Sequence, residues 1–387
     1  MGTSRAMEKV KYQDHSMIKK TVFLLILVLL TGCDGDKNIV IIPTKTAIPA
    51  VLTSPSPAST LLVDSSSFDA SGEILASNNH GIYSVNVNSE KITVLSEDTF
   101  HLFKSVNARK KDLFYLQTTG AKNEPEDLFM FDGSSQGVVR FTNDSYWDYD
   151  LSASPNGMSL AYVSDRFDQT GLENRHKVIL YSRETNNENI LLEGNDPFMI
   201  KWSPVDSKLA ILSLPVDEKT NRSLVILDTV SKKTINSFEI NDPSAFNWSP
   251  DGQFLAIGGF SPNKIAIINV ETSSINLFSI PKELIGGIAW SPDGNSILLQ
   301  SYTSITNQGS SDLVLLDINT GDIKLLFNGE MHPGNYLNKF IWSPDGNYIA
   351  FITLNEYDKI NIMNISTLQI TKLNFSYYFL ELLAWTQ

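Results

Sequence analysis

The sequence predicts an all-β fold, a seven-bladed β-propeller of four-stranded antiparallel blades, from three observations. A Trp-Ser-Pro-Asp-Gly motif recurs, with degenerate copies, at intervals of about 40 to 50 residues, which is the length of one propeller blade. Short runs rich in β-branched and aromatic residues fill each interval, for example residues 254–257 and 313–317. No stretch keeps the hydrophobic period of about 3.6 residues that marks an amphipathic helix.

The composition excludes several classes of function. The 387 residues are 42% hydrophobic, which is enough to bury a core. The formal net charge is −13, so a phosphate backbone is repelled and nucleic acid is not an expected partner. The single cysteine excludes a disulfide framework and a cysteine-clustered zinc site, because both need several sulfurs.

Residues 1–32 are predicted to be a signal peptide, with Met17 as an alternative start. A basic pair precedes the apolar run 22–30, which is shorter than the roughly 20 residues needed to span a bilayer. Leu30-Thr31-Gly32-Cys33 resembles the bacterial lipobox, and that resemblance implies cleavage after Gly32 and an acyl lipid, a diacylglycerol, on Cys33. We therefore expect an exported lipoprotein that is membrane-anchored on the extracytoplasmic side. The alternative is a buried cysteine that follows a hydrophobic helix.

Residues 33–60 follow as a low-complexity segment of Pro, Thr, Ser and Ala. Such a composition forms no core and behaves as a semi-extended tether. A disordered leader without a spacer role is the alternative.

The recurring motif has a mechanical interpretation as a hairpin turn between the first and second strands of each blade. Pro fixes φ, Asp bonds to the local backbone and Gly closes the turn without steric cost, while the preceding Trp can fill the space between blades. The alternative interpretation is that the aspartates form a series of metal-binding or acid–base groups. The full copies comprise Trp248, Pro250, Asp251 and Gly252; Trp290, Pro292, Asp293 and Gly294; and Trp342, Pro344, Asp345 and Gly346. Degenerate copies begin at Phe68, Val106, Ala153 and Trp202, and a last fragment begins at Trp385.

These repeats resemble the TolB-like, WD-type β-propeller family over residues 61–387. The resemblance implies the propeller fold, and it is clearest in the C-terminal half. The first two units depart from the pattern, which leaves eight blades as an alternative. We expect the C-terminal strand, 380–385, to complete the first blade and close the ring, which removes exposed sheet edges.

One face of the predicted ring carries a candidate contact patch. Trp147, Asp148 and Tyr149 lie in one interblade loop, and Arg166 and Arg175 lie in the next loop on the same face. Aromatic rings beside charged groups are typical of binding surfaces, since rings supply contact area at little entropic cost. The alternative is that the aromatics fasten the loop to neighbouring blades.

The same face is expected to hold four histidines, His80, His101, His176 and His332. Neutral imidazole is a common metal ligand, and histidines of different blades can converge over a central channel. The family resemblance implies an analogy with polysaccharide lyases that hold a metal through such histidines. Ordinary surface histidines are the opposing interpretation.

The leading functional prediction is a lipid-anchored extracytoplasmic propeller that binds a protein or a cell-envelope polymer without catalysis. It requires no cofactor beyond the lipid on Cys33. The alternative is a metal-dependent, lyase-like enzyme that uses a divalent metal on the histidine face.

Overall fold

The structure is a computed structural model, and the chain divides into two compact units, residues 1–42 and 43–387. The structure describes residues 70–78, 81–97, 106–109, 112–118, 126–132, 137–165, 176–193, 197–214, 222–240, 243–261, 263–282, 284–302, 311–329, 331, 340–353, 358–377 and 380–386. All of them belong to the second unit. The predicted signal peptide 1–32, Cys33 and the tether 33–60 lie outside these ranges.

Within these ranges, no helix combines the length and the apolar character that crossing a membrane would require.

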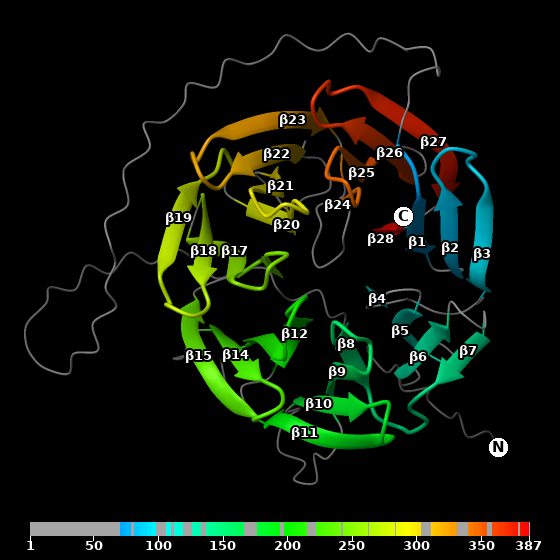
Figure 1. Cartoon of the computed structure of the whole chain (residues 1–387), viewed down its shortest axis with the longest axis vertical. Coiled ribbons are helices and arrows are strands. Elements are labelled where there is room, and N and C mark those ends of the chain that lie inside the picture. Colours follow the sequence, from blue (N-terminus) through cyan, green and yellow to red (C-terminus); the bar gives the residue numbers. More distant parts are fainter. Residues whose placement is uncertain are drawn as a thin grey trace, which may run out of the picture. The chain divides into compact units, whose positions relative to one another are not determined.

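The described strands pair into seven four-stranded antiparallel sheets, which follow one another around a ring (Figure 1). The first three sheets in chain order are β28–β1–β2–β3 (Glu381–Thr386, Glu73–Asn78, Gly81–Asn86, Ile92–Glu97), β4–β5–β6–β7 (Val106–Arg109, Asp112–Thr118, Glu126–Asp132, Gly137–Arg140) and β8–β9–β10–β11 (Asp148–Ala153, Ser159–Ser164, Lys177–Ser182, Asn187–Glu193).

The remaining sheets repeat the same order in the C-terminal half. They are β12–β13–β14–β15 (Pro197–Trp202, Lys208–Ser213, Arg222–Asp228, Lys233–Ile240), β16–β17–β18–β19 (Ala245–Trp248, Phe254–Ser261, Lys264–Asn269, Ile275–Ser279), β20–β21–β22–β23 (Leu284–Trp290, Ser296–Tyr302, Ser311–Asp317, Ile323–Gly329) and β24–β25–β26–β27 (Phe340–Trp342, Tyr348–Thr353, Asp358–Asn364, Ile370–Tyr377).

The predicted architecture of four-stranded antiparallel blades is confirmed, but the blades are not equally described. Six sheets have described side chains in all four strands, whereas β4 and β5 are described by their backbone alone. The expectation of seven blades is corrected to six fully described blades and a partly described sheet, β4–β7. That sheet begins at the weakest copy of the motif, Val106, where Trp, Pro and Gly are all missing.

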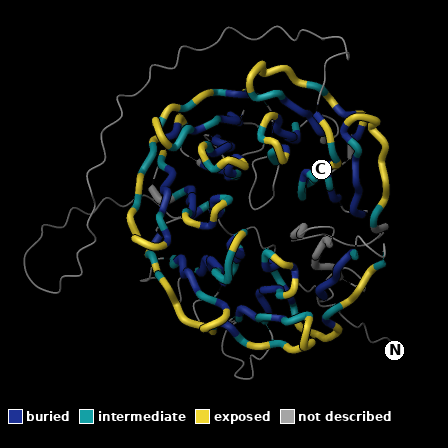
Figure 2. Tube along the Cα trace, viewed as in Figure 1, coloured by how far each residue is buried: buried dark blue, intermediate teal, exposed yellow. Residues whose placement is uncertain are grey.

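Burial explains why the strands differ in composition. The second strand of a blade packs on both faces, so β13 is buried at every position after Lys208. Such a strand is a continuous apolar run rather than an alternating one. The outermost strand β15 alternates instead and is largely exposed. Figure 2 shows this gradient as an exposed outer rim around buried inner strands.

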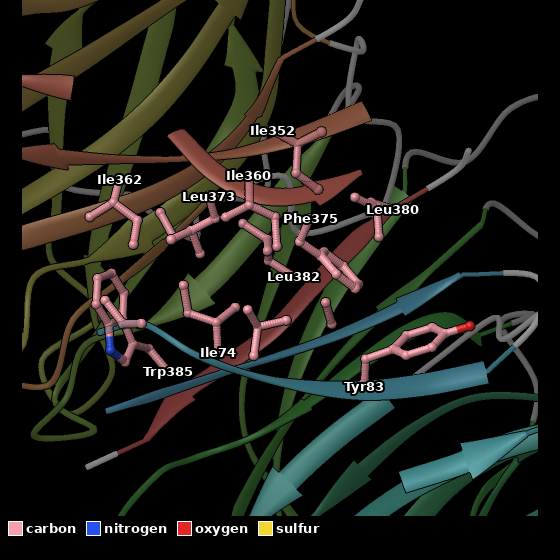
Figure 3. Packing of buried hydrophobic residues seen from close by; sticks show 14 of the residues in the cluster. Ile74, Tyr83, Ile352, Ile360, Ile362, Leu373, Phe375, Leu380, Leu382 and Trp385 are labelled. Atoms are coloured by element: carbon pink, nitrogen blue, oxygen red, sulfur yellow. The ribbon is translucent and has the colours of Figure 1, made fainter. Parts of the chain in front are cut away.

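The ring closes as the sequence predicts. β28, the C-terminal strand, pairs with β1, and Trp385 lies opposite Ile74. Leu380, Leu382 and Trp385 join one buried cluster that contains residues of β25–β27 and of β1 and β2 (Figure 3). The last strand therefore joins the first sheet and packs against the last one.

The motif tryptophans connect neighbouring sheets through a repeated hydrogen bond. The indole Nε1 of Trp248 donates to the carbonyl oxygen of Lys201 at 2.8 Å, and Trp290 donates to Asn247 at 3.1 Å. Trp342 repeats the contact with Ala289 at 3.2 Å. Each acceptor is the residue immediately before the preceding sheet's motif Trp, so each indole both fills the space between two blades and pairs an inner-strand carbonyl.

Candidate functional site

The candidate site is the segment 141–147, which joins β7 to β8 between two neighbouring sheets. Tyr146 is 40% exposed, the largest exposure of any aromatic side chain among the described residues. Trp147 beside it is half-buried, and β8 begins at the fully buried Asp148. The loop therefore presents two aromatic side chains at its surface.

A buried carboxylate on the preceding sheet holds the start of this loop. Asp127 of β6 is 2% exposed and forms an ion pair with Arg140. Asp127 Oδ1 also lies 3.1 Å from the Thr142 hydroxyl and accepts the Asp144 N–H at 3.4 Å. Arg140 Nε donates in turn to the Thr142 carbonyl at 2.8 Å. These contacts fix the backbone on both sides of Thr142.

The end of the loop is held by the next sheet. The Trp147 N–H donates to Asp165 Oδ1 at 2.8 Å, and the Asp165 N–H donates to the Trp147 carbonyl at 3.1 Å. Between the two anchors, Asp144 Oδ1 accepts the Tyr146 N–H at 2.9 Å. The aromatic side chains are therefore carried on a preorganised backbone, which lowers the entropy cost of binding.

Asp148, Tyr149 and Asp150 continue into β8 and serve the contacts between blades. Asp148 is fully buried, with Oδ2 3.3 Å from the Thr142 hydroxyl. The register shifts between Tyr149 and Leu151, and Asp150 has a φ of 27° at this bulge. Its Oδ2 accepts the Ile200 N–H of β12 at 2.7 Å. The bulge thus turns a β8 carboxylate toward the open edge of the next blade's first strand.

Lys201 follows on β12 and lies 5.9 Å from the ring centre of Phe246 on β16. Burial lowers the pKa of Lys201, and the negative charge of Asp150 opposes this shift. Burial disfavours the ammonium form, and a nearby carboxylate favours it. This inner region therefore joins three successive blades.

The structure describes some of the predicted site residues. Trp147 is half-buried in the loop 141–147, whereas Asp148 is fully buried, with its Oδ2 3.3 Å from the Thr142 hydroxyl. Tyr149 is half-buried and its ring meets that of His176 edge-on, 4.8 Å between centroids. The other predicted members, Arg166, Arg175, His80, His101 and His332, lie outside the described residues.

The sequence did not point to Asp127, Arg140, Thr142 and Asp165. Asp127 acts on residues 13 to 17 positions away, and Asp165 acts on Trp147 18 positions away. No local pattern marks such pairs. The one available signal is that the loop follows β7 directly, and because β7 is antiparallel to β6 this places the loop beside the first residues of β6.

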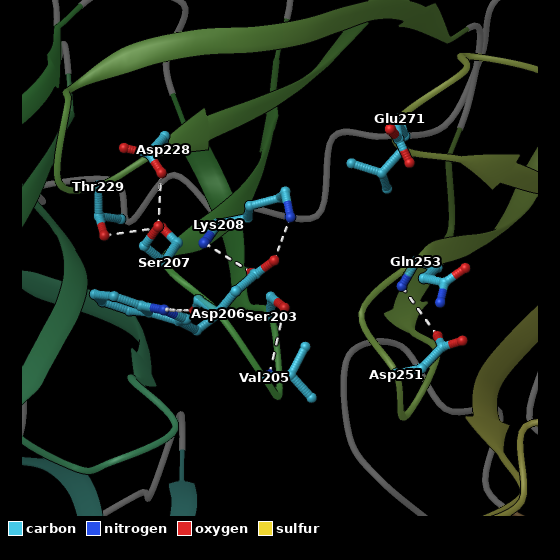
Figure 4. A network of polar contacts seen from close by, with 12 residues as sticks. Ser203, Val205, Asp206, Ser207, Lys208, Asp228, Thr229, Asp251, Gln253 and Glu271 are labelled. Carbon is cyan, nitrogen blue, oxygen red and sulfur yellow. Dashed lines mark hydrogen bonds and ion pairs between the residues drawn. The ribbon is translucent and has the colours of Figure 1, made fainter.

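The predicted turn aspartates lie at the opposite ends of the strands. The hydroxyl groups of the motif serines donate to the aspartates two positions on, at 2.6 Å for Asp251, 2.5 Å for Asp293 and 2.5 Å for Asp345. Each carboxylate also accepts the backbone N–H two residues later, as Gln253 shows in Figure 4. Gly252, with a φ of 68°, closes the turn, and a Cβ there would meet Val205 Cγ2 at 2.6 Å.

Among the residues that the structure describes, no group of three or more His, Cys, Asp or Glu is placed to hold a metal ion.

Comparisons with known proteins agree on the fold. The family model of the eukaryotic translation initiation factor eIF2A matches residues 230–368. No curated protein matches the chain. The solved oligogalacturonate lyase of Vibrio parahaemolyticus is 15% identical, with a TM-score of 0.59 over 76% of this chain and 87% of that one. An oligogalacturonate lyase in complex with manganese is 15% identical, with a TM-score of 0.55 over 70% and 79%.

TolB from Acinetobacter baumannii is also similar, with 14% identity, a TM-score of 0.47 and 80% of each chain covered. At these identities the two lyase structures show a shared fold and no more. The predicted β-propeller is confirmed.

Proposed function

We propose that this chain is a lipid-anchored, extracytoplasmic β-propeller that binds another protein or an envelope polymer through the loop 141–147 and does not catalyse a reaction. The observation that carries the proposal is the exposed Tyr146 and half-buried Trp147 on a backbone anchored at both ends. Anchored aromatic side chains bind with little loss of conformational entropy. The lipid anchor rests on the lipobox-like residues Leu30 to Cys33.

The test is crosslinking of the full lipoprotein in its native envelope. We expect the double variant Tyr146→Ala and Trp147→Ala to lose the crosslinked partner, while Tyr146→Phe, which keeps the ring, retains it. Val230→Ala is the matched surface control, because Val230 is 80% exposed in the turn between β14 and β15. A partner that is captured equally by the double variant and the wild type contradicts the proposal.

The same preparation tests the anchor. Cys33→Ser should leave the membrane fraction and lose the mass of the acyl lipid. A Cys33→Ser protein that still sediments with membranes would overturn the anchoring.

The alternative is a metal-dependent enzyme related in chemistry to the lyases that share the fold. His176, the one candidate ligand within the described ranges, has its ring packed edge-on against Tyr149. Elemental analysis of protein purified without chelator separates the two. A stoichiometric transition metal that is lost in His332→Ala favours the enzyme.

A further inference from the structure

One end of the sheet β12–β15 carries the two most exposed large apolar side chains among the described residues. Val230 is 80% exposed and Val205 is 54% exposed. Val205 lies in the turn from β12 to β13, and Val230 lies in the turn from β14 to β15. Because the strands are antiparallel, both turns lie at the same end of the sheet. Two neighbouring turns therefore place aliphatic surface in solvent.

The repeat has polar residues at both of these positions in its other described turns. Val205 directly follows the motif proline, and the residues that follow the corresponding prolines are Asn156, Asp251, Asp293 and Asp345. Val230 lies two residues before Lys232, whose φ is 58°. The equivalent turns of the other five fully described sheets also contain a residue with positive φ, and two residues before it they have Asn88, Glu184, Glu271, Asn319 and Ser366. The apolar surface is therefore specific to this sheet.

Hydrogen bonds hold the two turns against each other. The Ser207 carbonyl oxygen accepts the Thr229 N–H at 2.9 Å and the Thr229 hydroxyl at 2.8 Å. The Ser207 hydroxyl donates to Asp228 Oδ2 at 2.6 Å (Figure 4). The two valines are thus carried on a preorganised backbone, which lowers the entropy cost of binding.

This end of the sheet also carries positive charge on a chain whose net charge is −13. Lys232 and Lys233 are both exposed, and neither forms an ion pair with a described residue. Lys208 is paired with Asp206, so these two groups cancel. Asp228 is the remaining carboxylate of the two turns, and two lysines outnumber it. The turns therefore combine aliphatic surface with an excess of positive charge.

The neighbouring sheets limit this surface to one blade. The sheet β12–β15 lies between β8–β11 and β16–β19 in the ring (Figure 1). At the position of Val230 these two sheets carry the exposed Glu184 and Glu271. A flat anionic membrane would meet these glutamates as well as the lysines, and like charges disfavour the contact. A narrow chain segment that lies across one sheet avoids them.

We propose that the turn end of the sheet β12–β15 binds a partner protein through a segment that carries both carboxylates and aliphatic side chains. The aliphatic groups would cover the two valines, and the carboxylates would pair with the two lysines. The surface lies at the opposite end of the strands from the loop 141–147, because β8 begins directly after that loop and ends at its own motif turn. The inference therefore goes beyond the proposed function and does not depend on it.

The test uses the full chain in detergent and three labelled synthetic peptides. The first contains glutamate, leucine and serine. Lysine replaces glutamate in the second peptide, and serine replaces leucine in the third. Fluorescence anisotropy follows binding at low and high salt, with detergent alone as the blank. We expect the first peptide to bind more tightly than the other two and to weaken as salt rises.

The repeat itself supplies variants that its turns accommodate. Asparagine occupies the position of Val205 at residue 156 and the position of Val230 at residues 88 and 319. We expect the double variant Val205→Asn and Val230→Asn to keep its unfolding midpoint in urea and to bind the first peptide about tenfold more weakly. Asn319→Ser is the matched control, an exchange at the equivalent position of the sheet β20–β23, and should bind like the wild type. Affinity unchanged in the double valine variant overturns the inference.

The lysines are tested in the same way. The equivalent pair in the sheet β8–β11 is Asn186 and Asn187, and Asn186 has a φ of 56°, close to that of Lys232. We expect the double variant Lys232→Asn and Lys233→Asn to bind the first peptide about fivefold more weakly and with less dependence on salt. Equal binding of the lysine-containing peptide by the wild type would rule out an acidic partner.

Two measurements distinguish other occupants. Vesicles of phosphatidylcholine and phosphatidylglycerol test a lipid surface, and the full chain with Cys33→Ser is used so that no acyl lipid anchors it. Flotation with these vesicles that is abolished by the two lysine substitutions would overturn the protein partner. Self-association in sedimentation that is abolished by the two valine substitutions would overturn it in favour of a second copy of this chain.

Failure of this inference is separable from failure of the proposed function. The double variant Tyr146→Ala and Trp147→Ala should bind the first peptide like the wild type. The double valine variant should keep the partner that is crosslinked through the loop 141–147. Peptide binding that is lost in the loop variant and retained in the valine variant would contradict the placement of this second surface.

Discussion

Asp127 is a positioning residue for the loop 141–147, which carries Tyr146 and Trp147. It lies on β6, a different sheet from β8, and its carboxylate contacts the Arg140 guanidinium, the Thr142 hydroxyl and the Asp144 N–H. The Asp127 side chain therefore fixes the start of the loop 141–147, which leads from its own sheet to the next one. A carboxylate can do this because it accepts several hydrogen bonds at once.

We expect Asp127→Ala to cost about 2 kcal/mol in the free energy of unfolding, since a buried partner is removed from Arg140 and Thr142. The sharper readout is local: amide hydrogen exchange of residues 141–147 should accelerate, while exchange in the sheet β20–β23 stays unchanged. Asp127→Asn, which keeps an acceptor for the Asp144 N–H, should have an intermediate effect. Loop exchange identical in Asp127→Ala and the wild type would rule out the positioning role.

Sequence reasoning located the loop but not the direction of its side chains. The run from Trp147 to Asp150 alternates aromatic residues with aspartate, so either set could face solvent. Asp148 is fully buried; it pairs with Ser164 of β9, and its Oδ2 lies 3.3 Å from the Thr142 hydroxyl. The pairing with β9 joins residues far apart in the sequence, and such a contact leaves no local signal.

At the scale of the element, the recurring turn was predictable because its interactions are local. Serine, aspartate and glycine within five residues supply the hydrogen bonds and the left-handed φ. A related device closes the turn after β14. There the Ser207 hydroxyl donates to Asp228 Oδ2 at 2.6 Å (Figure 4). The Ser231 N–H donates to Asp228 Oδ1 at 2.6 Å.

These turns predict a specific acid sensitivity. Hydrogen bonds from Ser207 and Ser231 lower the pKa of Asp228 from 3.8 to about 2. The hydrogen bond from Ser291 likewise lowers the pKa of Asp293. Because the folded state favours the ionised form, this stabilisation is present above pH 3.8 and is lost as the pH falls toward 2. Urea unfolding between pH 6 and pH 2 should show a shallower loss for Asp228→Asn. An identical pH profile in variant and wild type would refute this assignment.

At the scale of the whole molecule, the ring was predictable where the motif is intact and less so where it decays. The seven motif intervals and the terminal strand 380–385 allowed closure by the last strand to be expected. The motif copy that begins the sheet β4–β7 lacks Trp, Pro and Gly, so only the β-rich runs that follow this copy indicated a blade there. The hydrogen bonds from each indole to the preceding blade could not be derived, because spacing does not show which carbonyl an indole meets.

Closure by β28 is the feature on which the ring as a whole depends, and removing residues 380–387 tests it. The deletion exposes the pairing edge of β1 and takes Leu380, Leu382 and Trp385 from the cluster between the first and last sheets. Losing three buried apolar side chains should cost more than about 5 kcal/mol, and an open edge favours aggregation. We expect the truncated chain to unfold at a much lower urea concentration and to self-associate in sedimentation experiments.

Trp385→Phe is the matched control for this deletion. It keeps a ring but loses the 2.8 Å hydrogen bond from Nε1 to the Ser71 carbonyl, at a cost of about 1 kcal/mol in the free energy of unfolding. A truncated chain that remains monomeric with an unchanged unfolding midpoint would mean that the other blades hold the ring without its closing strand.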